Sequence, residues 1–132
     1  MRTSVAILLA LAACTGTTVC AGCGGDDGVD DLPDAFHIAL VYDHSVPAVV
    51  ECSQRDLVGA NLTGMTGSMP MLADKPCSAP QVVDGAWTFT CSVNPPPENW
   101  HVTIAGDLSG GTLVHELVND NCSDYFTITA VR

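Results

Sequence analysis

Short segments of alternating apolar and polar residues, separated by turn-forming residues, make up the sequence from residue 36 onwards. The alternation is clearest where Trp87, Phe89, Cys91 and Val93 are interleaved with threonine and serine. A period of two puts one set of side chains on each face of a β-strand, whereas a helix has a period near 3.6. Residues 36–132 are therefore predicted to form an all-β domain, an antiparallel β-sandwich of about seven strands.

Turn-forming residues set the expected limits of these strands. Asp84-Gly85 is the strongest hairpin signal, because both central residues of a tight two-residue turn favour positive φ. Pro95-Pro96-Pro97 should end the strand before it, since proline donates no backbone hydrogen bond. For residues 53–76 one short strand or a long loop fits equally well. The expected strands are Phe36–Tyr42, Val46–Cys52, Val82–Val83, Ala86–Val93, His101–Ala105, Thr112–Val118 and Tyr125–Val131.

The first residues of the chain have the pattern of a secretory signal peptide. Arg2 is the only charged residue before Asp26, and the apolar run Val5–Ala13 follows it. At about 1.5 Å per helical residue, such a short run covers less than half of a ~30 Å bilayer core. A positive start, a short apolar stretch and small residues predict a cleaved signal rather than a membrane-spanning helix.

Two cysteines near this segment are candidates for lipidation. Residues 11–14 and Ala21-Gly22-Cys23 resemble the lipobox of bacterial lipoproteins, whose cysteine is acylated and becomes the new N-terminus. Cys14 has the better local motif, but Cys23 leaves a signal of ordinary length, so Cys23 is preferred. Acyl chains contribute about 0.8 kcal/mol per buried methylene, enough in combination to hold a domain at a membrane. The alternative is ordinary cleavage after Ala21, which would release a soluble protein.

These features divide the chain into a lipoprotein signal peptide (1–22), an acidic Gly/Asp tether (23–35) and the β domain (36–132). Glycines and clustered aspartates in the tether favour an extended, solvated spacer. The predicted location is the bacterial cell envelope, as an outer membrane lipoprotein facing the periplasm or the surface. With 15 acidic and 4 basic residues, a net charge of −11 argues against nucleic-acid binding, because the chain has no basic stripe.

Four cysteines remain in the β domain once the signal and the lipidated residue are set aside: Cys52, Cys77, Cys91 and Cys122. An even number in an oxidising compartment predicts disulfides, for which three pairings exist. Across an Asp84-Gly85 turn, Cys77 and Cys91 would lie almost opposite one another, which favours that pair and leaves Cys52 with Cys122. Metal binding by four thiolates is the alternative, but the domain has no C-x-x-C spacing.

The residues from Tyr42 onwards resemble a known family. Val46-Pro47, Cys77, Asp84-Gly85 before the strand ending in Cys91, residues 100–106, Asn121-Cys122 and the last strand are together similar to carboxypeptidase-regulatory-like domains. Those domains are transthyretin-like β-sandwiches of bacterial envelope lipoproteins. The resemblance implies a non-catalytic binding or structural role. The triple proline and the irregular stretch from residue 53 to 71 depart from the family pattern.

No residue pattern predicts catalysis or a cofactor. His115-Glu116 begins like a zinc-protease motif, but Asn119 stands where the second histidine is required. Imidazole is a usual copper or zinc ligand, so a periplasmic metal-binding protein is the alternative function. Its candidate ligands are His37, His44, His101 and His115.

Trp100 follows the triple proline and has two interpretations, a core residue or an exposed platform for a sugar or peptide. The expected partners are accordingly the membrane, through the lipid anchor, and an envelope protein or glycan.

Overall fold

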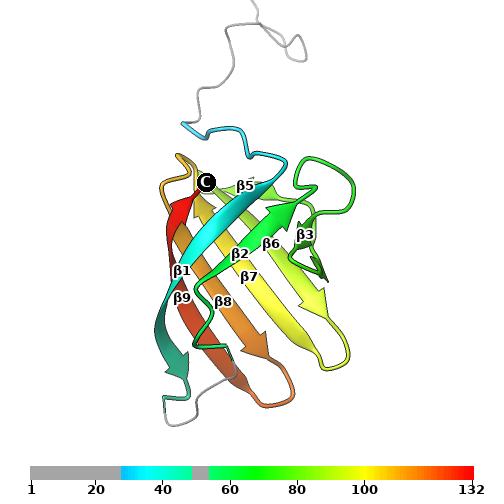
Figure 1. Ribbon diagram of the computed structural model, residues 1–132, viewed down its shortest axis with the longest axis vertical. Helices are drawn as coiled ribbons and strands as arrows, with labels where there is room; N and C mark the ends of the chain where they lie inside the picture. Colours follow the sequence, from blue (N-terminus) through cyan, green and yellow to red (C-terminus); the bar gives the residue numbers. More distant parts are fainter. Residues whose placement is uncertain (1–27, 49–53) are drawn as a thin grey trace, which may run out of the picture.

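The computed structural model describes residues 28–48 and 54–132, which form one antiparallel sheet (Figure 1). Its strands occur in the order β4-β3-β2-β1-β9-β8-β7-β6-β5. No helix among these described residues is long and apolar enough to cross a membrane. The strands are β1 (Phe36–Val46), β2 (Gly59–Thr63), β3 (Met71–Leu72), β4 (Lys75–Pro76), β5 (Gln81–Val83), β6 (Ala86–Val93), β7 (Glu98–Ala105), β8 (Gly111–Leu117) and β9 (Cys122–Val131).

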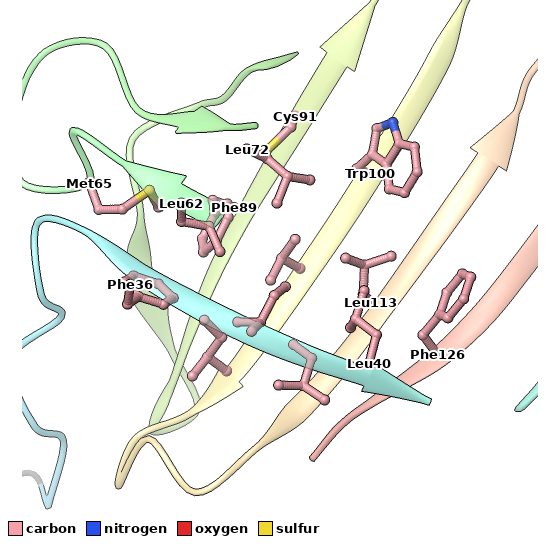
Figure 2. Close-up of a cluster of buried hydrophobic side chains, with 14 of the residues drawn as sticks. Phe36, Leu40, Leu62, Met65, Leu72, Phe89, Cys91, Trp100, Leu113 and Phe126 are labelled. Carbon is pink, nitrogen blue, oxygen red and sulfur yellow. The ribbon is translucent and has the colours of Figure 1, made fainter. Parts of the chain in front are cut away.

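The sheet curls into a half-barrel with the apolar core on its concave face. Figure 1 shows β1 and β2 crossing in front of β6, β7 and β8, and Figure 2 shows buried side chains between these two parts of the sheet. Alternate residues of each strand point inward, so the period of two in the sequence becomes the inner and outer faces of the sheet. The buried apolar residues include Phe36, Ile38, Leu40, Leu62, Leu72, Phe89, Val102, Ile104, Leu113, Phe126 and Ile128.

The structure confirms the hairpin that the sequence predicts. Val83 pairs with Ala86 across a two-residue turn, and Asp84 and Gly85 both have positive φ, 50° and 75°. β6 ends at Val93, just before the triple proline, as expected. The local turn chemistry therefore determines where these two strands begin and end.

The all-β antiparallel prediction is confirmed, whereas the expected arrangement as a sandwich of about seven strands differs from what is observed. In the described ranges, 28–48 and 54–132, nine strands form one continuous sheet, and its curvature brings the two halves of the inner face together. Residues 53–76 account for much of the difference, because that stretch contains three strands, β2, β3 and β4, instead of one strand or a loop. Curling one sheet buries the same alternating pattern that two packed sheets would bury, so the sequence pattern suits both.

The break expected between the strands Phe36–Tyr42 and Val46–Cys52 is wrong, because β1 continues through Asp43-His44-Ser45 to Val46. Along this stretch β1 pairs with β9, and the register shifts between Tyr42 and His44. The strand expected at Val46–Cys52 does not continue beyond Val46 into residues 47–48, which form a bend and a turn after the end of β1. The rest of that expected strand lies outside the described residues.

Part of the predicted tether contacts the β domain. Leu32 is only 6% exposed and belongs to the apolar core. The backbone of Asp30 donates a hydrogen bond to Gly106, and its carbonyl accepts one from the indole of Trp87 at 2.9 Å. Asp34 accepts hydrogen bonds from the backbone and hydroxyl of Thr66, which lower the pKa of its carboxyl. Residues 30–34 thus dock on the half-barrel.

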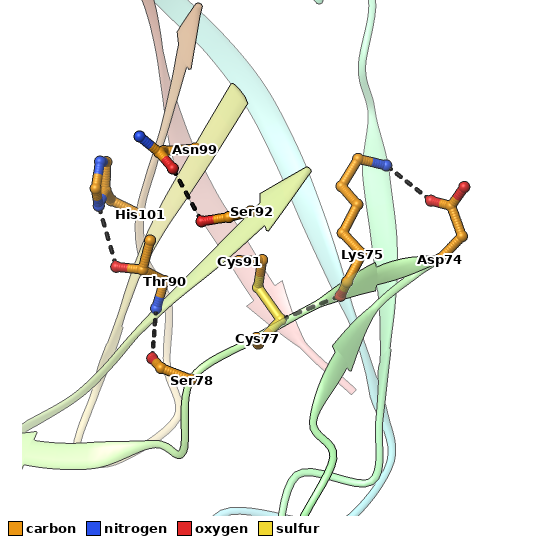
Figure 3. Close-up of a disulfide and its surroundings, with 9 residues drawn as sticks. All are labelled: Asp74, Lys75, Cys77, Ser78, Thr90, Cys91, Ser92, Asn99 and His101. Carbon is orange, nitrogen blue, oxygen red and sulfur yellow. Dashed lines mark hydrogen bonds and ion pairs between the residues drawn. A yellow bond between two sulfur atoms is a disulfide. The ribbon is translucent and has the colours of Figure 1, made fainter. Parts of the chain in front are cut away.

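A disulfide joins Cys77 to Cys91, the pairing that the hairpin register favoured (Figure 3). The two residues also form an isolated antiparallel bridge, so the chain leaving β4 runs beside β6. The covalent bond therefore closes the β2–β4 side of the half-barrel onto its opposite side. Cys122 is buried and disulfide-bonded, whereas Cys52 lies outside the described residues, so the pairing of these two stays a prediction.

Candidate functional site

One row of directly opposed residues crosses the inner face of the sheet and carries most of its buried polar groups. The strand registers place Cys91 opposite Trp100, Trp100 opposite His115, His115 opposite Asp124 and Asp124 opposite Ser45. We call these five residues, on β6, β7, β8, β9 and β1, the inner row. Directly opposed residues in antiparallel strands have neighbouring side chains, so the sheet register alone brings these groups together.

Ser45 enters the inner row because β1 is irregular. Even-numbered residues face inward along the first part of β1, as buried Phe36, Ile38 and Leu40 show. The register shift after Tyr42 reverses this parity, and Ser45 points inward instead. A β-bulge has this effect, since one extra residue exchanges the faces of all residues beyond it.

Hydrogen bonds hold the carboxylate of Asp124, which is completely buried. The hydroxyl of Ser45 donates to Asp124 Oδ1 at 2.5 Å, and the backbone N–H of Gln54 donates to Oδ2 at 3.3 Å. Because the one proton of Ser45 goes to Asp124, the Tyr42 hydroxyl, 2.7 Å away, must donate to Ser45 Oγ. A buried carboxylate needs such donors to offset the loss of water.

His115 lies between two carboxylates, and its side chain has no exposed surface. Its Nε2 is 3.1 Å from Oε2 of Glu98, so the Nε2–H donates to that carboxylate. Its Nδ1 is 3.7 Å from Oδ2 of Asp124, beyond hydrogen-bonding distance. Nδ1 has no hydrogen-bond partner among the described residues.

Trp100 is 3% exposed and packs against His115, with ring centroids 4.0 Å apart. The ammonium of Lys75 lies 5.3 Å from the centre of the indole, in the range of a cation–π contact. Trp100 is therefore a core residue, which was one of its two interpretations from the sequence. It does not form an exposed platform. Within residues 28–48 and 54–132, its Nε1–H has no hydrogen-bond partner.

A pocket of about 380 Å³ opens beside Trp100, between β2–β4 and the start of β7. Lys75 and Glu98 contribute opposite charges to it, and Trp100 forms part of its wall. The other lining residues are apolar or carry amide and imidazole groups: His37, Gln54, Leu57, Gly59, Ala60, Asn61, Leu72 and Ala73. The pocket is thus apolar with a few polar groups, the usual composition of a small-molecule site.

The two charged side chains of the pocket do not neutralise one another. Lys75 forms an ion pair with Asp74 at 2.9 Å, which lowers the pKa of the Asp74 carboxyl through that hydrogen bond (Figure 3). Glu98 contacts His115 instead, and among the described ion pairs no Lys75–Glu98 pair lies within 4.0 Å. The side chains of Lys75 and Glu98 are 23% and 17% exposed, so both remain accessible from the pocket.

The four histidines that were candidate metal ligands occupy different environments. His37 contacts the side chain of Asn61 at 2.8 Å, and His44 stacks on Tyr125. His101 is exposed on β7 and contacts Thr90 and Glu116. In the described part of the chain, no group of three or more His, Cys, Asp or Glu side chains is arranged to hold a metal ion.

Sequence reasoning identified Trp100 and His115 but not their neighbours in the site. Asp124 had one available signal, a carboxylate at an inward position of a strand, between Cys122 and Phe126. Ser45 had none, because the parity change in β1 arises from its pairing with β9. Lys75 and Glu98 come from β4 and β7, and only the curvature of the sheet brings them to one pocket.

No family model, curated protein or solved structure matches this chain. The resemblance to carboxypeptidase-regulatory-like domains therefore stays a prediction.

Proposed function

We propose that this chain is a membrane-anchored lipoprotein of the bacterial cell envelope whose β domain binds a small polar ligand without catalysing a reaction. The observation that carries the binding function is the pocket between β2–β4 and β7. Its volume of about 380 Å³ is near the lower end of the range of small-molecule sites, about 300–1,000 Å³.

The hydrogen bonds of the inner row support binding over catalysis. A serine nucleophile needs a base, usually histidine, that accepts its proton. The proton of Ser45 is directed to Asp124 instead, and Ser45 is itself buried. His115 is fully buried behind Glu98 and Trp100, so its ring has no access to a substrate. These groups support the wall of the pocket rather than react in it.

The N-terminal sequence supports the anchor, and the disulfide agrees with it. Ala21-Gly22-Cys23 resembles a lipobox, and the short apolar run before it is too short to span a bilayer. Disulfides such as Cys77–Cys91 persist in oxidising compartments, which include the bacterial periplasm. Both observations favour export of the chain to the envelope.

The intact mass of the mature protein, extracted from membranes of a bacterial expression host, tests the anchor. Acylation at Cys23 gives a mass equal to residues 23–132 plus the acyl and glyceryl groups. Blocking the lipoprotein signal peptidase should leave a larger precursor. An unmodified amino terminus after Ala21, on protein recovered from the soluble fraction, would contradict the anchor.

The two tryptophans provide a test of the pocket by nuclear magnetic resonance. Trp100 forms part of the pocket wall, whereas the indole N–H of Trp87 donates a hydrogen bond to the carbonyl of Asp30 elsewhere on the half-barrel. Small polar molecules that bind in the pocket should shift the Trp100 indole resonance and leave the Trp87 resonance unchanged. If none of a broad set of sugars, amino acids and organic acids shifts Trp100, the binding function is wrong.

A further inference from the structure

We infer that the pocket recognises a small zwitterion, with the size and charges of an amino acid or dipeptide, by holding its carboxylate at Lys75 and its ammonium group at Glu98. This inference rests on the proposed binding function and adds the chemical class of the ligand. It depends on the two charges and on the covered indole, in a pocket whose volume of about 380 Å³ suits a small molecule.

Lys75 is an unusual residue in this chain. The sequence contains only 4 basic residues against 15 acidic ones, and one of the basic residues lines the pocket. The ammonium has three donors, of which Asp74 takes one in the described structure. Lys75 therefore retains donors for a carboxylate, in a protein whose net charge of −11 otherwise repels anions.

Glu98 has matching capacity for a cation. One oxygen, Oε2, accepts a hydrogen bond from His115, and no hydrogen bond to Oε1 is present among the described residues. An ionised carboxylate has about four lone-pair sites, so Glu98 has acceptors to spare for an ammonium group. Lys75 and Glu98 do not form an ion pair within 4.0 Å, so a ligand does not have to break one to reach either group.

The covered indole argues against a sugar as the ligand. Sugars bind on open aromatic faces, but Trp100 is 3% exposed, with His115 and Lys75 packed against it. The indole N–H of Trp100 is buried and has no hydrogen-bond partner among the described residues. Trp100 forms part of the pocket wall. A buried hydrogen-bond donor without a partner is unfavourable. A ligand whose acceptor atom reaches this N–H would therefore gain binding free energy from the hydrogen bond.

The test is a titration of the mature, disulfide-bonded protein, which keeps its lipid anchor and is held in detergent micelles. Binding is monitored by nuclear magnetic resonance at the indole resonances of Trp100 and Trp87. The probes are L-alanyl-L-alanine, its N-acetyl derivative, its C-terminal amide and maltose. The zwitterionic dipeptide should shift Trp100 and spare Trp87. Removing either charge of the dipeptide should weaken binding about tenfold or more, because each charge makes a charge-assisted contact.

Variants assign the two contacts. Lys75→Gln should reduce the affinity for L-alanyl-L-alanine about tenfold or more, and so should Glu98→Gln. Lys75→Arg keeps the positive charge and should retain most of the affinity. Glu116→Gln is the matched control, because Glu116 is also a carboxylate beside a histidine but lies away from the pocket, near exposed His101. It should leave the affinity within about twofold.

Each outcome decides the inference. The inference would be overturned if the acetylated or amidated dipeptide bound as tightly as L-alanyl-L-alanine, or if maltose alone bound. In either case the proposed binding function would still stand, because the pocket would bind a small molecule. The inference would also be overturned if no probe bound to the wild type or to the variants while their circular dichroism spectra showed the same fold. The broad screen for Trp100 shifts then decides separately whether the pocket binds anything.

Discussion

Ser45 and Asp124 show how one pair of side chains determines the character of the buried site. Asp124 carries a fully buried carboxylate, and the shortest hydrogen bond to it comes from Ser45. His115 approaches the same carboxylate only at 3.7 Å. The serine hydroxyl is thus the main side-chain partner that compensates for the lost hydration of Asp124.

Ser45→Ala should lower the free energy of unfolding by about 1.5–3 kcal/mol, because it removes a hydrogen bond to a buried charged group. The variant also leaves the Tyr42 hydroxyl without its acceptor. Urea denaturation followed by circular dichroism measures the change. Ser68→Ala, at an exposed bend, is the control and should change stability by less than about 0.5 kcal/mol. Equal effects of the two substitutions would contradict the role of Ser45.

Glu116 should make part of the stability depend on pH. Hydrogen bonds from Asn99 and then His101 lower the pKa of its carboxyl below the ordinary value of 4.5. A lowered pKa in the folded state contributes stability that is present above pH 4.5 and is lost as the pH falls through the folded-state pKa.

Glu116→Gln should remove that pH-dependent contribution. The melting temperature of the wild type should exceed that of the variant most at neutral pH, and the difference should shrink below pH 4.5. The side chain is 42% exposed, so solvent screening keeps the difference below about 1 kcal/mol. Melting curves recorded along an acid series measure it. A constant difference at all pH values would show that the ionised carboxylate contributes nothing.

At the scale of the elements, two features bring separate strands to one site. The irregular register between β1 and β9 turns Ser45 inward, and the bridge at Cys77–Cys91 holds the segment after β4 against β6. Lys75 belongs to β4, directly before this bridge. The position of the pocket's positive charge therefore depends on the disulfide.

Replacing both cysteines, Cys77→Ala with Cys91→Ala, should lower the free energy of unfolding by about 3 kcal/mol, the contribution expected for a closed loop of this length. The cation–π contact of Lys75 with Trp100 should also loosen, which would move the Trp100 indole resonance. Urea midpoints and the indole spectrum measure the two effects. A variant with the wild-type midpoint and an unmoved resonance would show that the strand pairing alone positions β4.

At the scale of the whole molecule, we propose separate roles for the β domain and the lipid anchor. Leu32 and Asp30 attach the chain to the half-barrel, so the proposed spacer between lipid and domain consists of the residues between Cys23 and Asp30. The strongly acidic chain is not attracted to anionic lipid by its side chains, so in the proposed anchored form the acyl groups alone would hold it at the membrane.

Cys23→Ser should therefore move the protein from the membrane fraction to the soluble periplasmic fraction, with loss of the acyl mass. Cys14→Ser is the matched control and should leave both the location and the mature mass unchanged. Immunoblots of fractionated cells, combined with intact mass, measure the outcome. The reverse behaviour of the two variants would place the lipid on Cys14, the other candidate.

Some features of this protein follow from its sequence alone. The period-two pattern, Asp84-Gly85 and the triple proline predicted the all-β class, one hairpin and its limits, because these depend on interactions between residues close in the sequence. The hairpin register also predicted the Cys77–Cys91 disulfide.

Only the tertiary structure decided how these strands associate and which groups meet. The alternating pattern buries one face equally well in two packed sheets or in one curled sheet, so it does not distinguish them. The bulge that turns Ser45 inward depends on pairing with β9, which is distant in the sequence. Lys75 and Glu98 likewise share a pocket because strands distant in the sequence pair and the sheet curves. The conformational preferences of neighbouring residues do not bring them together.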